Sequence, residues 1–402
     1  MNKFKKIYCR TFQTIFKIAI PFLPYRKPEI IGSVKKLPEI LQKKKCESVL
    51  IITDAGIMSL GLTKRLEQAL SDANIQFTIY DKTVANPTTV NVSEALELYY
   101  ENECNAIIGF GGGSSMDCAK AVGALVARPN KTLDDLKGIL KVHKKLPLLI
   151  AIPTTAGTGS ETTLAAVITD AETRHKYAIN DFPLIPRYAV LDPKVTLSLP
   201  PFITATTGMD ALTHAVEAYI GNSTTRGTRK DSLMAVELIF TNLDTAYETG
   251  SDIDARRNML KASFYAGCAF TKSYVGYVHA VAHSLGGEYN VPHGLANAIL
   301  LPFVLESYGE KIHKKLYKLA VAAGIADKDT PYDEAATLFI DAIKDMKKRY
   351  GIGDTVKEIR TEDISKLAKY ADKEANPLYP VPVLMNAKEL EQFYYMLMEE
   401  EA

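Results

Sequence analysis

Four of the seven histidines of this sequence crowd into two short segments, where they could bind a metal ion. The segment MDALTHAVEAY contains Asp210 and His214, and the segment YVHAVAHSLGGEYNVPHG contains three histidines, His279, His283 and His293. Asp210/His214 and His279/His283 are each spaced i, i+4, so on a helix each pair projects from one face. One carboxylate with several imidazoles suits Fe(II), Zn(II), Mn(II) or Co(II), and it does not suit Ca²⁺ or Mg²⁺.

Two other interpretations of this histidine cluster can be weighed from the residues alone. A lone histidine on an apolar face usually packs in a core, but three histidines within fifteen residues, with a DxxxH pair besides, argue against packing. A zincin-type hydrolase would need an HExxH motif to supply its general base, and here Ala280 follows His279. We therefore expect a metal site without that base, and the spacing leaves open whether His279 or His283 is the ligand.

A glycine-rich segment, GFGGGSSMDCAK from Gly109 to Lys120, follows an apolar run and opens a helical pattern. In that context the backbone N–H groups and the helix N-terminus can bind a phosphate. Gly111, Gly112 and Gly113 would let a pyrophosphate approach the backbone without interference from a Cβ, and the hydroxyl of Ser114 could donate. The segment reads GxGxxS and follows at least two earlier strands, so it differs from the usual dinucleotide fingerprint. A glycine-rich turn without a ligand is the alternative.

A second loop, PTTAGTGSET from Pro153 to Thr162, also follows an apolar run directly. Its hydroxyl residues and two glycines offer many short donors, so it could form the opposite wall of a phosphate-bearing cofactor site. Asp54 closes the first strand-like run in IITDAG and could accept a hydrogen bond from a ribose 2′-OH. A plain turn or helix cap is the alternative for each of these two features.

The elements that must position these residues change in kind near residue 200. Apolar runs alternate with helical patterns up to about residue 192, which predicts a parallel sheet covered by helices on both faces. The strand-like runs are residues 48–54, 76–82, 105–110 and 147–153, and the helical patterns are residues 62–74, 92–104 and 117–127. Pro200-Pro201 interrupts the alternation, and almost everything beyond it has helical period. We therefore predict two domains with ligands at the carboxyl ends of the strands: an α/β domain over residues 27–199 and an all-helical domain over residues 200–402.

The overall composition excludes several classes of protein. Of the 402 residues, 47% are hydrophobic and 24% are charged, which is typical of globular proteins and not of disordered or collagen-like ones. The net charge of +1 gives no indication of a nucleic-acid partner. The five cysteines are widely spaced and form no CxxC pair, so we expect reduced thiols and a cytoplasmic location.

Residues 1–26 form a basic, amphipathic N-terminal extension. Apolar residues recur there at helical spacing, while Lys3, Lys6, Arg10 and Lys17 take other faces. The uncharged run from residue 18 to 25 is far shorter than the roughly 20 residues of a spanning helix, and no signal-peptide cleavage pattern follows it. We expect a helix that packs on its own or a partner subunit, with membrane-surface binding and a targeting role as the less favoured alternatives.

Taken together, these segments resemble the iron-containing (group III) alcohol dehydrogenase family. The resemblance runs from about Lys27 to the C-terminus and is carried by GGGSSMDCAK, IPTTAGTGSE, LDP, TGMDALTHAVEAY and HAVAHSLGGEYNVPHGLANAILLP, in that order. It implies a Rossmann-like dinucleotide-binding α/β domain followed by an all-α domain, as in the dehydroquinate synthase-like architecture, with the metal in the cleft.

The resemblance also implies roles for particular residues. The metal ligands would be Asp210, His214, His279 and His293, with His283 unligated beside them as a proton relay. Phe270 matches an aromatic residue that lines the substrate pocket. The implied cofactor contacts are Asp54, Asn86, Gly112, Gly113, Ser114, Thr154, Thr155, Thr158 and Lys176. A carboxylate at Asp54 would repel the 2′-phosphate of NADP, so NAD is the expected cofactor.

The implied activity is hydride transfer between a primary alcohol, or an aldehyde in reverse, and NAD(H), with one divalent metal as Lewis acid. Fe(II) is the favoured metal and Zn(II) the alternative, and a homodimer or larger homo-oligomer is expected. The alternatives are a glycerol- or polyol-dehydrogenase-type enzyme of the same fold and a non-catalytic metal-binding assembly protein. A lyase of the dehydroquinate synthase type is disfavoured, because no Arg or Lys lies between His279 and His293 to hold a substrate phosphate. The residues do not distinguish among individual alcohols.

Overall fold

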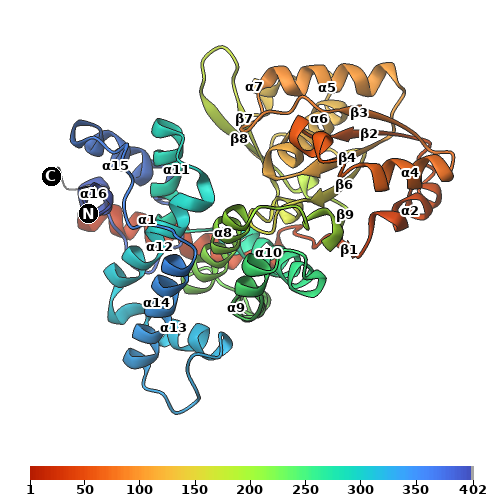
Figure 1. Cartoon of the computed structure of the whole chain (residues 1–402). Coiled ribbons are helices and arrows are strands. Elements are labelled where there is room, and N and C mark those ends of the chain that lie inside the picture. Colours follow the sequence, from red (N-terminus) through yellow and green to blue (C-terminus); the bar gives the residue numbers. More distant parts are fainter. Residues whose placement is uncertain (400–402) are drawn as a thin grey trace. The chain divides into compact units, whose positions relative to one another are not determined.

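A computed structural model describes residues 1–399 and divides them into two compact units (Figure 1). The α/β unit consists of Pro24–Leu199 with Thr249–Phe264. The helical unit consists of Met1–Leu23, Pro200–Glu248 and the described residues from Tyr265 onward. The N-terminal extension thus belongs to the helical unit, although it precedes the α/β unit in the chain.

The α/β unit is built on a six-stranded parallel sheet with the order β1-β9-β6-β4-β2-β3. The strands are β1 (Glu29–Ile31), β2 (Ser48–Ile52), β3 (Gln76–Tyr80), β4 (Ala106–Gly111), β6 (Leu148–Pro153) and β9 (Tyr188–Val190). All five residues of β2 and all six of β4 are buried, as expected for central strands of a sheet covered on both faces. The predicted parallel α/β fold is confirmed.

Alternate residues of the central strands enter two separate apolar cores. Leu50 and Ile107 pack on one face with residues of α5 (Thr89–Glu101) and α6 (Gly113–Ala127). Ile51 and Ile108 pack on the other face with residues of α2 (Leu37–Lys43) and α4 (Lys64–Asp72). This arrangement of helices on both faces leaves the carboxyl ends of the strands to be closed by loops (Figure 1).

A smaller three-stranded sheet lies beside α6 in the same unit. It has the order β5-β8-β7, with β5 (Gly138–Ile139) parallel to β8 (Lys176–Asn180) and β8 antiparallel to β7 (Ala165–Thr169). The turn between β7 and β8 forms the long hairpin that projects from this unit in Figure 1. The sequence analysis did not identify these strands, because they are short and half-exposed.

The helical unit is assembled around α8, which is buried on every side from Thr204 to Ile220 except at Thr207. Helices α9, α12 and α13 pack against α8. The elements are α1 (Lys3–Ala19), α8 (Pro201–Ile220), α9 (Arg226–Glu248), α11 (Tyr277–Tyr289), α12 (His293–Tyr308), α13 (Glu310–Ala322), α14 (Tyr332–Arg349), α15 (Thr361–Ala375) and α16 (Ala387–Leu397). Helix α10 (Ile253–Ser273) passes from one unit to the other at residue 264. The predicted all-helical second half is confirmed.

All five cysteines are buried. Within residues 1–399, no helix has both the length and the apolar character that crossing a membrane requires.

Candidate metal centre and cofactor loop

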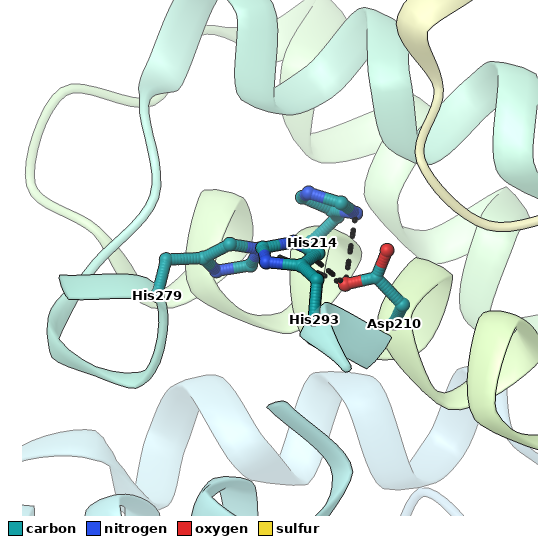
Figure 2. Close-up of side chains that lie close together, drawn as sticks. All are labelled: Asp210, His214, His279 and His293. Carbon is teal, nitrogen blue, oxygen red and sulfur yellow. Dashed lines mark ion pairs between the residues drawn. The ribbon is translucent and has the colours of Figure 1, made fainter. Parts of the chain in front are cut away.

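Three helices of the helical unit bring four potential metal ligands together. Asp210 and His214 lie one turn apart on α8, His279 lies on α11, and His293 is the first residue of α12. Each side chain offers one ligand atom, and these four atoms all lie within 4.8 Å of one another. Figure 2 shows the side chains converging from the three helices. The chain therefore has a His/Asp cluster that could hold a metal ion.

The distances inside this cluster suit an ion better than direct hydrogen bonds. Oδ1 of Asp210 lies 3.4 Å from Nε2 of His293 and 3.9 Å from Nε2 of His279. The same oxygen lies 3.9 Å from Nδ1 of His214 (Figure 2). Donor atoms held about 2.1 Å from one ion in tetrahedral geometry lie about 3.4 Å apart, so the observed separations are close to those of a ligand set. Asn297 donates from Nδ2 to the same carboxylate oxygen at 2.7 Å and fixes its orientation.

The carboxylate of Glu217 orients His279 by holding the ring nitrogen that faces away from the cluster. Its Oε2 lies 2.6 Å from Nδ1 of His279, and the carboxylate also accepts the N–H groups of Gly276 and Val278, each at 2.8 Å. Since Nδ1 is engaged by the carboxylate, Nε2 of His279 faces the cluster. That nitrogen is buried and has no hydrogen-bond partner among residues 1–399. A carboxylate that fixes the distal nitrogen of a histidine is the usual support of a metal-binding imidazole.

The electrostatics of this pair favour a neutral imidazole, which is the form that binds metals. Burial lowers the pKa of His279 well below its usual value, and the neighbouring imidazoles lower it further. Burial raises the pKa of Glu217 to about 7, against the opposing effect of its backbone N–H donors. The sequence analysis missed Glu217, although it follows Asp210 and His214 at i+7 and i+3 on the same helix face.

His283 lies beside the cluster but outside the four-residue set. Its Nδ1 lies 2.7 Å from Oε1 of Glu374, and its side chain is 42% exposed. Its ring stacks on that of His293 with centroids 5.1 Å apart. Burial lowers the pKa of His283, but Glu374 outweighs that effect and the net pKa is raised. Glu374 is a second residue that the sequence analysis missed, because it lies 91 residues further along the chain.

Phe270 is placed next to the cluster by α10. Its ring stacks on that of His214, with centroids 4.2 Å apart and planes inclined by 15°. This contact puts an apolar wall directly beside one potential ligand.

The predicted glycine loop of the α/β unit connects β4 to α6. Gly111 has φ +155°, and a Cβ there would lie 2.5 Å from Oγ of Ser115, so the turn requires glycine. Gly112 is the N-cap of α6 and has no side chain to occupy the helix N-terminus. The nearest atom to a Cβ at Gly112 would be Oγ1 of Thr155, at 3.9 Å, and a Cβ at Gly113 would meet Thr158 at 3.5 Å. The loop therefore presents open backbone N–H groups to a ligand.

Neighbouring loops bring most of the other predicted cofactor contacts to this helix N-terminus. The N–H of Asn86 donates to Oγ of Ser114 at 3.2 Å, and the N–H of Thr154 donates to the carbonyl of Gly111 at 3.0 Å. Oγ of Ser115 lies 3.5 Å from Oδ2 of Asp54. Asp54 also caps the short helix α3 (Ala55–Ser59), accepting from the N–H of Ile57 at 3.0 Å.

Two observations bear on whether this loop fits a phosphate-bearing cofactor. Oγ1 of Thr155 is buried without a hydrogen-bond partner among the residues that the structure describes, and it lies next to the open glycine backbone. A phosphate oxygen would satisfy such a donor, so the residues present fit the group. Lys176 is less central, because it begins β8 and pairs with Thr169, and within residues 1–399 no hydrogen bond joins it to the glycine loop.

A buried network joins α6 to the second predicted loop. Lys120 donates from Nζ to Oγ of Ser160 at 2.8 Å and to Oγ1 of Thr163 at 2.7 Å. Asp117 accepts from the same Ser160 hydroxyl at 2.9 Å and from the N–H of Val167 at 3.1 Å. The sequence analysis placed both loops at one cofactor site but did not identify this connection between them.

An α/β unit with an open glycine loop at a helix N-terminus and a helical unit with a His₃Asp cluster are the combination expected of a metal-dependent dehydrogenase. The model of the family described as "Iron-containing alcohol dehydrogenase" matches residues 30–193, and that described as "Fe-containing alcohol dehydrogenase family, C-terminal" matches residues 204–398. The chain belongs to the iron-containing alcohol dehydrogenase family.

Similar proteins extend this result over most of the chain. "Alcohol dehydrogenase 4" of Saccharomyces cerevisiae is 38% identical over 86% of this chain and 89% of its own length. The "NAD-dependent methanol dehydrogenase" of Bacillus methanolicus is 35% identical over 85% of this chain and 90% of its own length. A crystal structure of "1,3-propanediol oxidoreductase" superimposes with a TM-score of 0.88 at 33% identity, covering 92% of this chain and 97% of the other.

The expectations about family, fold and activity are therefore confirmed. The protein is an oxidoreductase that transfers a hydride between an alcohol or aldehyde and NAD(H) with the help of a divalent metal.

Proposed function

We propose that Asp210, His214, His279 and His293 are the protein ligands of one divalent metal, at which short primary alcohols are oxidised. The observation that carries this proposal is the convergence of four ligand atoms within 4.8 Å. The buried, unsatisfied Nε2 of His279 supports it, because a bound cation would compensate that atom. When bound, the metal supplies Lewis acidity that lowers the pKa of the alcohol, and NAD supplies the hydride acceptor.

We assign His283 the role of carrying the alcohol proton to solvent. Glu374 holds its Nδ1, which leaves Nε2 to accept a proton. The side chain is 42% exposed, so a proton taken up at Nε2 can exchange with water. The Glu374 carboxylate also stabilises the imidazolium that forms. Phe270, stacked on His214, would form an apolar wall for the alkyl part of the substrate.

We assign cofactor binding to the loops at the carboxyl ends of the sheet strands. The α6 N-terminus at Gly112, Gly113 and Ser114 would hold the pyrophosphate. Asp54 would contact the ribose and favour NAD over NADP. The remaining cofactor contacts in this assignment are Asn86, Thr154, Thr155, Thr158 and Lys176. In this proposal residues 27–199 form the cofactor domain, residues 200–402 form the metal domain, and residues 1–26 are an extension.

The similar proteins and the chemistry of the ligand set support proposals for the substrate class and the metal. Two similar proteins are named for methanol and for 1,3-propanediol, which supports short primary alcohols, including diols, as substrates. Fe(II) is the proposed metal and Zn(II) the alternative, because three imidazoles and a carboxylate suit both. Five buried, widely spaced cysteines agree with the proposed cytoplasmic location. We further propose a homodimer or larger homo-oligomer.

A turnover assay under anaerobic conditions tests this proposal. Metal-stripped protein is reloaded with Fe(II) or Zn(II) and given C2 to C6 alcohols, diols and the matching aldehydes with NAD(H) or NADP(H). We expect a metal-dependent absorbance change at 340 nm with NAD(H) and a primary alcohol. Stoichiometric binding of metal and NAD without turnover of any of these compounds would refute the proposed substrate class.

A further inference from the structure

The N-terminal helix α1 contacts the helical unit through its polar face. Arg10 donates to the carbonyls of Val381 and Pro382 at 2.7 and 2.8 Å. Gln13 is 3% exposed and donates to the carbonyl of Tyr379 at 2.7 Å. These bonds hold the middle of α1 against the segment that follows α15. The helix is therefore anchored by hydrogen bonds of its polar side chains, together with Phe16, whose ring packs edge-on against Tyr274 at a centroid distance of 5.1 Å.

The opposite face of α1 and of the short helix that continues it is apolar and exposed. Phe4 is 86% exposed and Phe22 84% exposed, and the exposures of the others lie between 54% and 65%. The six residues are Phe4, Ile7, Tyr8, Ile15, Ile18 and Phe22, which we call the outer stripe. Their spacing places them on one side along a length of about 28 Å. Surface apolar residues of soluble proteins are usually scattered singly, so a continuous stripe marks a surface that binds something.

The helix that carries the outer stripe is basic. Helix α1 contains five Lys/Arg residues and no Asp or Glu. By helical spacing Lys3 borders the stripe, whereas Lys6 and Lys17 lie further round the helix, towards Arg10. All three side chains are exposed, and none of them forms an ion pair with a residue that the structure describes. Burial, and then Lys17 among the nearby cations, lower the pKa of Lys315 to about 8, which indicates a locally positive potential. The matching surface must therefore be both apolar and negatively charged.

This charge pattern distinguishes among the surfaces that could cover the stripe. A second α1 helix laid against the first would supply apolar contacts, but it would bring basic residues together without a carboxylate on either helix. An anionic lipid surface supplies both features, because acyl chains accept the apolar side chains while headgroup phosphates attract the lysines. A helix with a basic face and a Phe- and Ile-rich face is typical of segments that lie in the plane of a membrane surface.

We propose that the outer stripe of α1 binds the surface of bilayers that contain anionic lipids, with the helix parallel to the surface. Arg10 and Gln13 keep the helix on the protein while its apolar side enters the headgroup region. Because the helix is already folded and anchored, binding does not have to offset the cost of ordering it. This inference is independent of the proposed metal chemistry, since it uses none of the ligand or cofactor residues.

The absence of tryptophan from this chain makes a direct optical test available. The substitution Phe4→Trp introduces a single indole at the most exposed position of the stripe. With vesicles of 3:1 phosphatidylcholine:phosphatidylglycerol at low salt, we expect a blue shift of its emission and co-sedimentation of the protein. With phosphatidylcholine vesicles alone, or at high salt, we expect binding at least about tenfold weaker.

Matched variants distinguish vesicle binding by the outer stripe from nonspecific binding by other exposed apolar residues. The double substitution Ile15→Glu/Ile18→Glu should weaken vesicle binding by at least about tenfold, because two apolar side chains are lost from the lipid contact. Lys3→Gln/Lys6→Gln/Lys17→Gln should remove the preference for anionic vesicles. The control Ile139→Glu/Leu338→Glu changes two other exposed apolar residues and should bind like the parent. Circular dichroism and turnover should be unchanged in all three variants.

Two results would overturn the proposal. One is the absence of binding to anionic vesicles at low salt, or binding that Ile15→Glu/Ile18→Glu leaves unchanged. The other is a protein that does not bind vesicles but self-associates in analytical ultracentrifugation, with dissociation in Ile15→Glu/Ile18→Glu. That second result would assign the stripe to contacts between copies of this chain.

Discussion

The metal cluster and the glycine loop are built for their ligands in opposite ways. In the cluster, side-chain atoms of Asp210 and three histidines point inward, and a further carboxylate, Glu217, fixes one of them from behind. In the loop, the absence of side chains at Gly111, Gly112 and Gly113 exposes the backbone, and hydroxyl groups surround it. A site made of side chains should lose its ligand when one donor is removed. A site made of backbone should instead lose affinity when a side chain is added.

The largest effect is expected from removing a metal ligand. Substituting a residue that hydrogen-bonds to a metal ligand typically weakens metal binding by roughly 10–100-fold. His279→Ala removes a proposed ligand itself, so it should weaken metal binding by more than that, and turnover should be lost with the metal. His283→Ala is the matched control, since we assign it no ligand role. It should retain stoichiometric metal and lose about 10²–10⁴-fold in kcat. Metal content by mass spectrometry and the visible spectrum of the Co(II)-substituted protein measure both variants. Metal loss in both, or in neither, would show that these roles are misassigned.

The next effect tests whether Glu217 supports His279. Glu217→Gln should weaken metal affinity by about tenfold and Glu217→Ala by up to about 100-fold, because Nδ1 of His279 loses its acceptor. Glu374→Gln changes the carboxylate that holds His283 and serves as the control, with unchanged metal affinity expected. Competition with a chelator measures the affinities without relying on turnover. Equal affinities in the Glu217 and Glu374 variants would refute the positioning role.

In the glycine loop, a methyl group added at Gly113 should affect NAD affinity, whereas one added at Gly111 should affect the stability of the fold. Gly113→Ala places a Cβ 3.5 Å from Thr158, an ordinary contact, so stability should be unchanged while NAD binding weakens about tenfold. Gly111→Ala adds a Cβ 2.5 Å from Oγ of Ser115 at a positive φ, so it should reduce the free energy of unfolding by about 1–3 kcal/mol. Thermal unfolding and NAD titration distinguish the two outcomes. Unchanged NAD affinity in Gly113→Ala would contradict the proposed pyrophosphate site.

These two kinds of site also differ in how far the sequence alone could predict them. The i, i+4 spacing brought Asp210 next to His214, and the structure adds His279 and His293 from two further helices. Spacing could not separate His279 from His283, because both lie on one face of α11 and the distinction depends on Glu217 and Glu374 from other helices. In the sequence alone Glu217 resembles an ordinary surface glutamate. Its role becomes visible only when the structure shows that α8 is covered on every side and that Glu217 is buried.

The parallel sheet was predictable because its central strands are long, buried and continuously apolar. The short strands β1, β7, β8 and β9 depend on pairing with distant segments, and their sequences alone carry little signal. The apolar periodicity predicted α1, and α1 packs on its own chain through Arg10 and Gln13 while most of its large apolar side chains are exposed. Periodicity shows that a helix has two faces and does not show which one docks, and here Arg10 and Gln13 bond to backbone carbonyls of the segment after α15.

The smallest effect concerns the choice between NAD and NADP at the edge of the glycine loop. Asp54→Asn can keep the N-cap of α3 while removing the charge. It should raise the NADP/NAD ratio of kcat/KM by about fivefold, because one like-charge repulsion near the surface is worth roughly 1 kcal/mol. Asp54→Ala should give a similar ratio with about 1 kcal/mol less stability, since the cap is lost. An unchanged ratio in both variants would remove Asp54 from the cofactor site.

The proposed metal centre requires that Asp210, His214, His279 and His293 together hold one divalent metal. The most direct measurement is anomalous diffraction at the iron and zinc absorption edges from crystals of the anaerobically reconstituted protein. We expect one strong peak about 2.0–2.2 Å from Oδ1 of Asp210 and from one nitrogen of each of the three histidines, with His283 unligated. A peak elsewhere, a ligand set that includes His283, or no peak in turnover-competent crystals would contradict it.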